Sequence, residues 1–171
     1  MTKSLPPLAF VALCMLVGVA CGREQPEPQA VPASIVVVDQ AGYGKELRDH
    51  YGGFRWPPDF RPDVDRLVTA TQPAPAERVQ SGVARTVLNV VNSCAWYLSW
   101  DTAHSRADHQ AIGDALQVMT DVLTTFPPPA DPVGKEFVER VAAQAEIGDP
   151  EPARQYVATN CPEIVWVAAG N

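Results

Sequence analysis

Basic residues are scarce in this sequence, and they are not clustered. The 171 residues include 13 Lys and Arg against 20 Asp and Glu, which gives a formal net charge of −7. Lysine occurs only at Lys3, Lys45 and Lys135. A face that binds nucleic acid or a sheet of anionic lipid headgroups needs several cationic side chains grouped together. The composition therefore argues against nucleic acid as a partner.

Catalytic and metal-binding signatures are also missing. There is no Gly-x-Ser-x-Gly motif, no phosphate-binding glycine loop and no closely spaced histidine pair. Asp101, His104 and Asp108 are explained by helix capping and helix-dipole interactions rather than by a metal. Glu139 and Glu146 are seven residues apart, or roughly 10 Å along a helix, a spacing that exposed helix faces carry routinely. We therefore predict no catalytic, metal-binding or cofactor-binding residue, and no enzyme.

An apolar run near the N-terminus is too short to cross a membrane. It extends from Leu8 to Ala20 and follows Lys3, whereas a spanning helix needs about 20 apolar residues. A positive residue followed by such a run is typical of an export signal. The tetrapeptide GVAC at residues 18–21 resembles the lipobox of bacterial lipoproteins, although that family prefers leucine where this chain has Gly18.

The resemblance to bacterial lipoproteins implies a division of the chain and a location. Residues 1–20 would be removed as a signal peptide, Cys21 would be acylated, and residues 21–34 would form a proline-rich tether. Residues 35–171 suffice for a single extracytoplasmic domain. The expected location is the extracytoplasmic face of the cell membrane, held by lipid, or the outer membrane in a diderm. Ordinary secretory cleavage beside Cys21 is the alternative.

The remaining cysteines form one pair. Cys14 would leave with the signal peptide and Cys21 would carry the lipid, which leaves Cys94 and Cys161. A lone pair outside the cytoplasm usually oxidises, so we predict a Cys94–Cys161 disulfide. Two buried free thiols are the alternative.

The hydrophobic pattern predicts a mostly α-helical domain, a small bundle of about four helices. Pro62 begins a short helical segment, and a long helix is expected from about residue 76 to 102. Further helices are expected from an N-cap at Ser105 to Phe126, from an N-cap at Asp131 to about residue 147, and from about residue 150 to 160. Val133, Phe137, Val141 and Ala145 are expected to face inward from the helix after Asp131.

The long helix carries the main expected core positions. Its apolar residues recur at spacings of three and four, which predicts one buried stripe. These residues are Val79, Val83, Val87, Val90, Val91, Cys94 and Leu98. Trp96 and Trp100 form a second face, and their large apolar surface favours burial over exposure to a partner.

Two apolar runs at the ends of the domain have strand composition. Residues 35–38 and 164–167 are both rich in β-branched side chains. A minor two-stranded sheet joining the termini is therefore considered alongside the helices.

Residues 41–62 mix glycine, proline and aromatics without a clear period, which predicts an irregular loop. Its aromatics either cover the helices or form a surface for a partner, and Trp56, Tyr51 and Phe54 are the candidates. The expected role is that of a membrane-tethered binding or envelope-support module, with an envelope protein as partner. A small-ligand carrier is the alternative, and a cell-envelope hydrolase is a weaker one.

Overall fold

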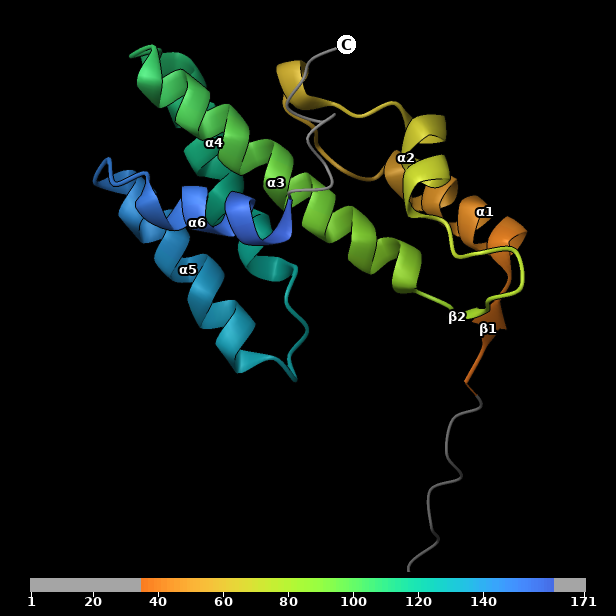
Figure 1. Cartoon of the computed structure of the whole chain (residues 1–171). Coiled ribbons are helices and arrows are strands. Elements are labelled where there is room, and N and C mark those ends of the chain that lie inside the picture. The colour runs from red at the N-terminus through yellow and green to blue at the C-terminus, as the bar shows by residue number, and fades with distance from the viewer. Residues whose placement is uncertain (1–34, 162–171) are drawn as a thin grey trace, which may run out of the picture. The chain divides into compact units, whose positions relative to one another are not determined.

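The computed structural model describes residues 35–161, and they form a mostly α-helical fold with a minor antiparallel sheet (Figure 1). The elements in chain order are β1 (Val37–Val38), α1 (Gln40–Tyr51), the 3₁₀ helix η1 (Pro58–Phe60), α2 (Val64–Thr71), β2 (Val79–Gln80), α3 (Val83–Ser105), α4 (His109–Asp121), the 3₁₀ helix η2 (Leu123–Thr125), α5 (Pro132–Glu146) and α6 (Glu151–Asn160). The predicted fold class is confirmed. Cys21, the signal peptide and the tether lie outside the described residues.

The long helix α3 is central, and two hydrophobic clusters form along it. Towards its N-terminus α3 packs against α1 and η1, and one cluster includes Leu88 of α3 and Leu47 of α1. Towards its C-terminus it packs against α4 and α6, and the second cluster includes Trp100 of α3 and Met119 of α4. Figure 1 shows α3 (green) passing between these two groups of helices.

The predicted irregular loop at residues 41–62 is wrong in its first half, which forms α1. Asp39 caps this helix, because its side chain accepts a hydrogen bond from Gly42 N at 2.9 Å. Tyr43, Leu47 and Tyr51 recur every four residues and are buried on one face. The glycines lower helix propensity by about 1 kcal/mol each, which obscured this period, and packing in the fold compensates for that cost.

The long helix begins later than predicted. Gly82 precedes it with a left-handed φ of 93°, so the helix starts at Val83 rather than near residue 76. The carboxylate of Glu46 in α1 holds the turn that leads into α3: it accepts hydrogen bonds from Ser81 Oγ at 2.7 Å and from Gly82 N at 3.1 Å. A residue distant in sequence thus binds the residue just before the helix, which has no side chain of its own to cap it.

The minor sheet is present, but β1 has a different partner from the one considered. Val37 pairs with Gln80 and Val38 pairs with Val79, so β1 joins the segment just before α3. The other candidate strand, residues 164–167, lies outside the described residues. The sheet therefore does not depend on a pairing of the two termini.

The expected core stripe of α3 is only partly buried. Val91 and Cys94 are buried, whereas Val83 is exposed and Val79, Val87, Val90 and Leu98 are half-buried. The indoles that formed the second predicted face are more deeply buried, with exposed fractions of 4% for Trp96 and 0% for Trp100. Helices pack on two sides of α3. Its tryptophans lie within one hydrophobic cluster, whereas Val87 and Leu98 are partly buried at the edge of the other.

The helix start predicted at Asp131 is confirmed, whereas those predicted at Pro62 and Ser105 are displaced to Asp63 and Asp108. Asp131 caps α5 by accepting from Gly134 N at 2.8 Å, with Pro132 in the first turn, as predicted. Ser105 was predicted to cap the next helix, but it ends α3, and Asp108 caps α4 by accepting from Ala111 N at 3.1 Å. The helix expected to run to Phe126 also ends earlier, at Asp121, and η2 follows it.

The inward positions of α5 follow the prediction except at its first turn. Val141 and Ala145 are buried, and Phe137 is half-buried. Val133 was expected to face inward, but its exposed fraction is 75%. Val133 belongs to neither hydrophobic cluster, so its position on the helical face does not bring it into the core.

The predicted disulfide is confirmed. Cys94 in the middle of α3 is bonded to Cys161 at the end of α6, with 6.1 Å between their Cα atoms. Both cysteines are buried. The bond joins α6 to α3 across 67 residues of sequence separation.

Candidate functional site

The three aromatic residues proposed for a partner surface lie together at the end of α1 and in the segment between α1 and η1. Tyr51 and Trp56 stack with ring centroids 5.2 Å apart, and Phe54 lies 5.9 Å from Trp56. Tyr51 is buried, and its hydroxyl donates to Pro62 O, so this residue belongs to the core. Phe54 and Trp56 are half-buried and leave part of their rings accessible. The structure therefore places two of the three candidates at the surface.

Arg55 holds this aromatic segment against α3. Its carbonyl oxygen accepts two hydrogen bonds, from Asn92 Nδ2 and from Trp96 Nε1, each at 2.8 Å. Its guanidinium lies over the Trp96 ring, 5.6 Å from the centroid, at a distance where a cation–π attraction acts. The loop after α1 is thus fixed to α3 by backbone and side chain together.

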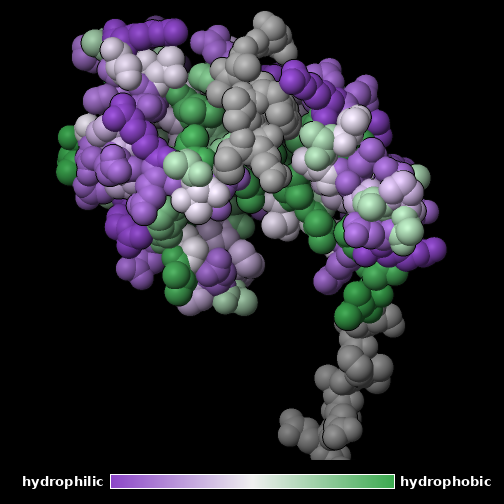
Figure 2. Space-filling view, in the orientation of Figure 1, coloured by the Kyte–Doolittle hydropathy of each residue, from purple (hydrophilic) through white to green (hydrophobic). Residues whose placement is uncertain are grey.

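Two hollows lie beside this anchored segment along α3. The first has a volume of about 190 Å³ and is lined by His50, Gly53, Phe54, Arg55, Arg85, Asn89, Val122 and Phe126. The second has a volume of about 240 Å³ and is lined by Thr86, Asn89, Val90, Ser93, Phe126, Pro127, Pro128, Asp131, Gly134, Phe137, Val138 and Tyr156. Asn89 and Phe126 belong to both walls, so the hollows adjoin, and we call the pair the α3 groove. The space-filling view shows the surface hollowed between α5 and α3 (Figure 2).

The two parts of the α3 groove differ in chemistry. The first part has three side chains that carry or can carry positive charge, His50, Arg55 and Arg85, and no carboxylate lines it. The second part is lined mainly by apolar and aromatic side chains. Its one carboxylate, Asp131, is engaged as the N-cap of α5.

Tyr156 forms one wall of the apolar part and stays neutral at physiological pH. Burial raises the pKa of Tyr156 above its ordinary value, and a hydrogen bond from Ser93 opposes this only in part. The ring meets Tyr97 edge-on with centroids 4.9 Å apart. Burial raises the pKa of Tyr97 as well, beyond the range in which tyrosine normally ionises. This wall is therefore uncharged and tightly packed.

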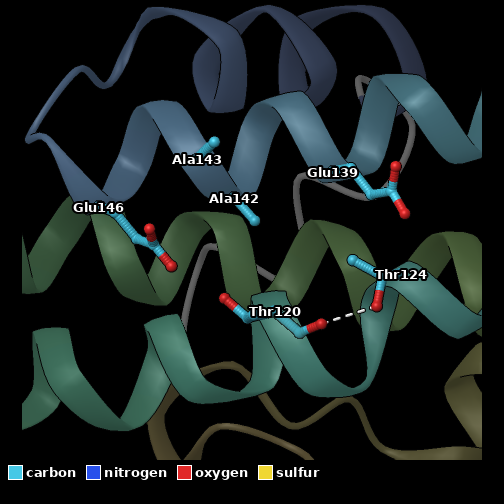
Figure 3. A pocket seen from close by; sticks show the side chains of 6 residues that line it. All are labelled: Thr120, Thr124, Glu139, Ala142, Ala143 and Glu146. Atoms are coloured by element: carbon cyan, nitrogen blue, oxygen red, sulfur yellow. Dashed lines mark hydrogen bonds between the residues drawn. The ribbon is translucent and has the colours of Figure 1, made fainter.

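A third hollow holds the two carboxylates whose spacing the sequence singled out. Glu139 and Glu146 of α5 lie at its opposite ends, with Ala142 between them and Thr120 and Thr124 on the facing helix (Figure 3). The hollow has a volume of about 300 Å³. Glu139 also pairs with Lys135 at 3.6 Å, and both of these side chains are more than half exposed. Such solvent-exposed carboxylates lack the low-polarity surroundings that a general acid needs.

The histidine and aspartate group near the end of α3 serves structure. Asp101 binds Arg154 through both carboxylate oxygens, with a shortest distance of 2.8 Å. This contact raises the pKa of Arg154. His104 stacks on Trp100 with ring centroids 5.1 Å apart, and Asp108 caps α4. Within residues 35–161, no group of three or more His, Cys, Asp or Glu side chains could hold a metal ion.

Sequence reasoning missed most of the groove walls. Arg85 and Asn89 are four residues apart on α3, and this spacing placed them on one helical face. Their partners, Phe126 after η2 and Arg55 after α1, come from elements distant in sequence. A periodicity within one helix could reveal one wall, but not the hollow.

Comparisons with protein families, characterised proteins and solved structures found nothing that matches this chain. In the part of the chain that the structure describes, no helix is both long and apolar enough to cross a membrane. The site itself must therefore carry the functional argument.

Proposed function

We propose that the protein is a lipid-anchored extracytoplasmic binding module whose ligand occupies the α3 groove. The anchor is Cys21, at the end of a segment that resembles a lipoprotein signal. Residues 21–34 act as a tether that keeps the folded domain near the extracytoplasmic face of a membrane. The domain works by binding and not by catalysis.

The observation that carries this proposal is the α3 groove. Ligand sites are concave, mainly apolar and marked by a few polar groups, with volumes of about 300 to 1,000 Å³. Each hollow alone is smaller than this range, but the two share walls and together reach its lower part. Phe54 lines the first hollow, so the aromatic segment predicted as a binding surface forms one of its walls.

The conformation of this segment suits a site that is formed in advance. Arg55 is held by two hydrogen bonds to α3, and Pro57, which follows Trp56, is buried. A rigid wall reduces the entropy lost when a ligand binds. Asp101 and Asp108, which were considered as metal ligands, already have structural partners, and Glu139 pairs with Lys135, which favours binding over hydrolysis.

A matched pair of threonine substitutions tests this role. Thr86 is exposed on α3 and lines the groove, and Thr69 is exposed on α2 outside it. Each hydroxyl donates to the carbonyl four residues earlier, so the two positions are locally alike. Thr86→Trp should obstruct the groove, whereas Thr69→Trp should only add an exposed indole.

The measurement is native mass spectrometry of the protein isolated from the membrane of its own source. We expect a bound molecule in the wild type and in Thr69→Trp, and its loss in Thr86→Trp. If Thr86→Trp retains the bound molecule at the wild-type level, the α3 groove is not the site. If the wild type carries nothing, the binding role itself fails.

Lipidation has its own test. Metabolic labelling with a fatty acid in a bacterial host should mark the wild-type protein, and Cys21→Ser should abolish both the label and removal of residues 1–20. Unchanged labelling of Cys21→Ser would refute the anchor. Cys14→Ser is the control, because this cysteine lies inside the proposed signal peptide and its loss should leave labelling intact.

A further inference from the structure

Three basic side chains from different elements converge on the first part of the α3 groove. His50 comes from α1, Arg55 from the segment after it, and Arg85 from the first turn of α3. The chain as a whole has a net charge of −7, so this grouping runs against its composition. A local cluster of this sign attracts anionic groups from solution.

Neither arginine forms an ion pair within the part of the chain that the structure describes. Across residues 35–161, ion pairs engage Lys45, Arg48, Lys135 and Arg154, and neither Arg55 nor Arg85 is among them. The guanidinium of Arg55 lies over the ring of Trp96. An arginine held by a ring and by its own backbone is pre-positioned for an incoming carboxylate or phosphate, to which it can donate two parallel hydrogen bonds.

The second part of the groove continues directly from this cationic end. Phe126 stands at the junction, and Val90 and Phe137 line the wall beyond it. Positive charge is therefore concentrated in one of two hollows that share Asn89 and Phe126, and apolar surface in the other. This polarity matches a ligand with an anionic head and an apolar chain.

We propose that the α3 groove binds a single-chain amphiphile with an anionic head, a carboxylate or a phosphate. The head lies between Arg55 and Arg85, and the chain passes Phe126 towards Val90 and Phe137. This inference rests on the binding function proposed above and names its ligand class. A tethered domain of this kind would receive a lipid-derived molecule from the adjacent membrane.

The test uses cis-parinaric acid, a fluorescent fatty acid, with the full chain carrying Cys21→Ser, which bears no attached lipid. Because this variant keeps the apolar residues 8–20, probe binding that remains when Thr86→Trp is added is counted as background. Dodecanoate, dodecyl phosphate, dodecanol, dodecyltrimethylammonium and inorganic phosphate are then added as competitors. Displacement by the two anionic chains is expected at concentrations at least tenfold below that of dodecanol, because a charged hydrogen bond to arginine adds about a factor of ten in affinity. Inorganic phosphate should not displace the probe, since it has no chain.

Arginine variants locate the head. Arg55→Gln and Arg85→Gln should each weaken dodecanoate binding about tenfold and leave dodecanol unchanged. Arg106→Gln is the control, because Arg106 is exposed after α3 and lines neither hollow. Thr86→Trp should block every chain, and Thr69→Trp should block none.

The outcomes separate this inference from the binding function. Two results would overturn the claim that the ligand has an anionic head: equal displacement by dodecanol and dodecanoate, or an unchanged dodecanoate affinity in both arginine variants. Either result would still leave the α3 groove as a binding site. Binding of the probe that Thr86→Trp does not affect, or no probe binding at all, overturns the amphiphile. In that case the mass-spectrometric test of the wild-type protein still decides whether the groove binds another molecule.

Discussion

Two buried tryptophans on α3 allow a direct test of how hydrogen bonding contributes to this core. Trp96 and Trp100 lie one helical turn apart, with exposed fractions of 4% and 0%. Trp96 Nε1 donates to Arg55 O at 2.8 Å. Trp100 Nε1 is buried and has no hydrogen-bond partner among the described residues. Replacing each indole with phenylalanine therefore removes a similar apolar surface. At Trp96 it also removes a stabilising hydrogen bond, whereas at Trp100 it removes a destabilising unpaired donor.

The expected magnitudes follow from those polar contributions. Trp96→Phe loses one hydrogen bond, worth about 1 kcal/mol, although Arg55 O keeps its bond from Asn92. In the wild type the unpaired Trp100 donor costs about 1 to 3 kcal/mol of stability, because its desolvation is not compensated by a hydrogen bond. Trp100→Phe removes this donor and so recovers that cost. The loss of packing is similar at both sites and cancels in the comparison. Trp96→Phe should therefore be the more destabilising substitution by about 2 to 4 kcal/mol.

Urea unfolding at neutral pH, followed by far-UV circular dichroism with the disulfide intact, measures this difference. The comparison holds if both variants keep the wild-type m-value, so that only the midpoint reports stability. Trp56→Phe is the control: its indole is half-buried with a long 3.4 Å contact to Tyr51 O, and the change should be small. Equal losses for the two buried sites, or a larger loss for Trp100→Phe, would refute the reasoning.

Three further predictions concern other stabilising features. The double substitution Cys94→Ala with Cys161→Ala should lower the free energy of unfolding by about 4 kcal/mol on the chain-entropy treatment of the closed loop; urea titrations should show it, and a change below about 1 kcal/mol would contradict that treatment. Burial raises the pKa of Tyr97, so its contribution to stability is complete below the unfolded-state pKa of about 10 and is lost as pH rises through the folded-state pKa. Tyr97→Phe should therefore reduce the loss of stability above pH 10 in melting experiments. An unaltered pH profile would count against this role of Tyr97. Hydrogen bonds from Ser81 and the backbone N–H of Gly82 lower the pKa of Glu46, so its contribution to stability is present above the unfolded-state pKa and is lost as pH falls. Glu46→Gln should therefore reduce the melting temperature at pH 7 and make the melting temperature fall less in acid. A steeper dependence on acid would exclude this role of Glu46.

Features that depend on local rules, or on a process of elimination, could be predicted from the sequence. Asp131 and Pro132 predict the start of α5, because a cap and a first-turn proline act within a few residues. The Cys94–Cys161 bond follows from the number of cysteines and the expected compartment. The burial of Trp96 and Trp100 follows from their size alone.

Tertiary structure decided the features that depend on contacts between distant segments. Residues 40–51 form a helix despite their glycines, because Tyr43 and Leu47 bury against the rest of the fold, and Gly44 allows the close approach of Val68. Glu46 defines the start of α3 from 36 residues away, which no local cap rule could foresee.

The candidate site is the clearest case of this limit. The basic residues are scattered along the sequence, yet folding brings His50, Arg55 and Arg85 to one end of the α3 groove. Phe126 closes the wall from a segment beyond α4. Composition and periodicity describe one segment at a time, whereas a binding site is defined by how several segments meet. The positively charged hollow lies beside the apolar one only because α1, α3 and α5 pack so that Asn89 and Phe126 line both.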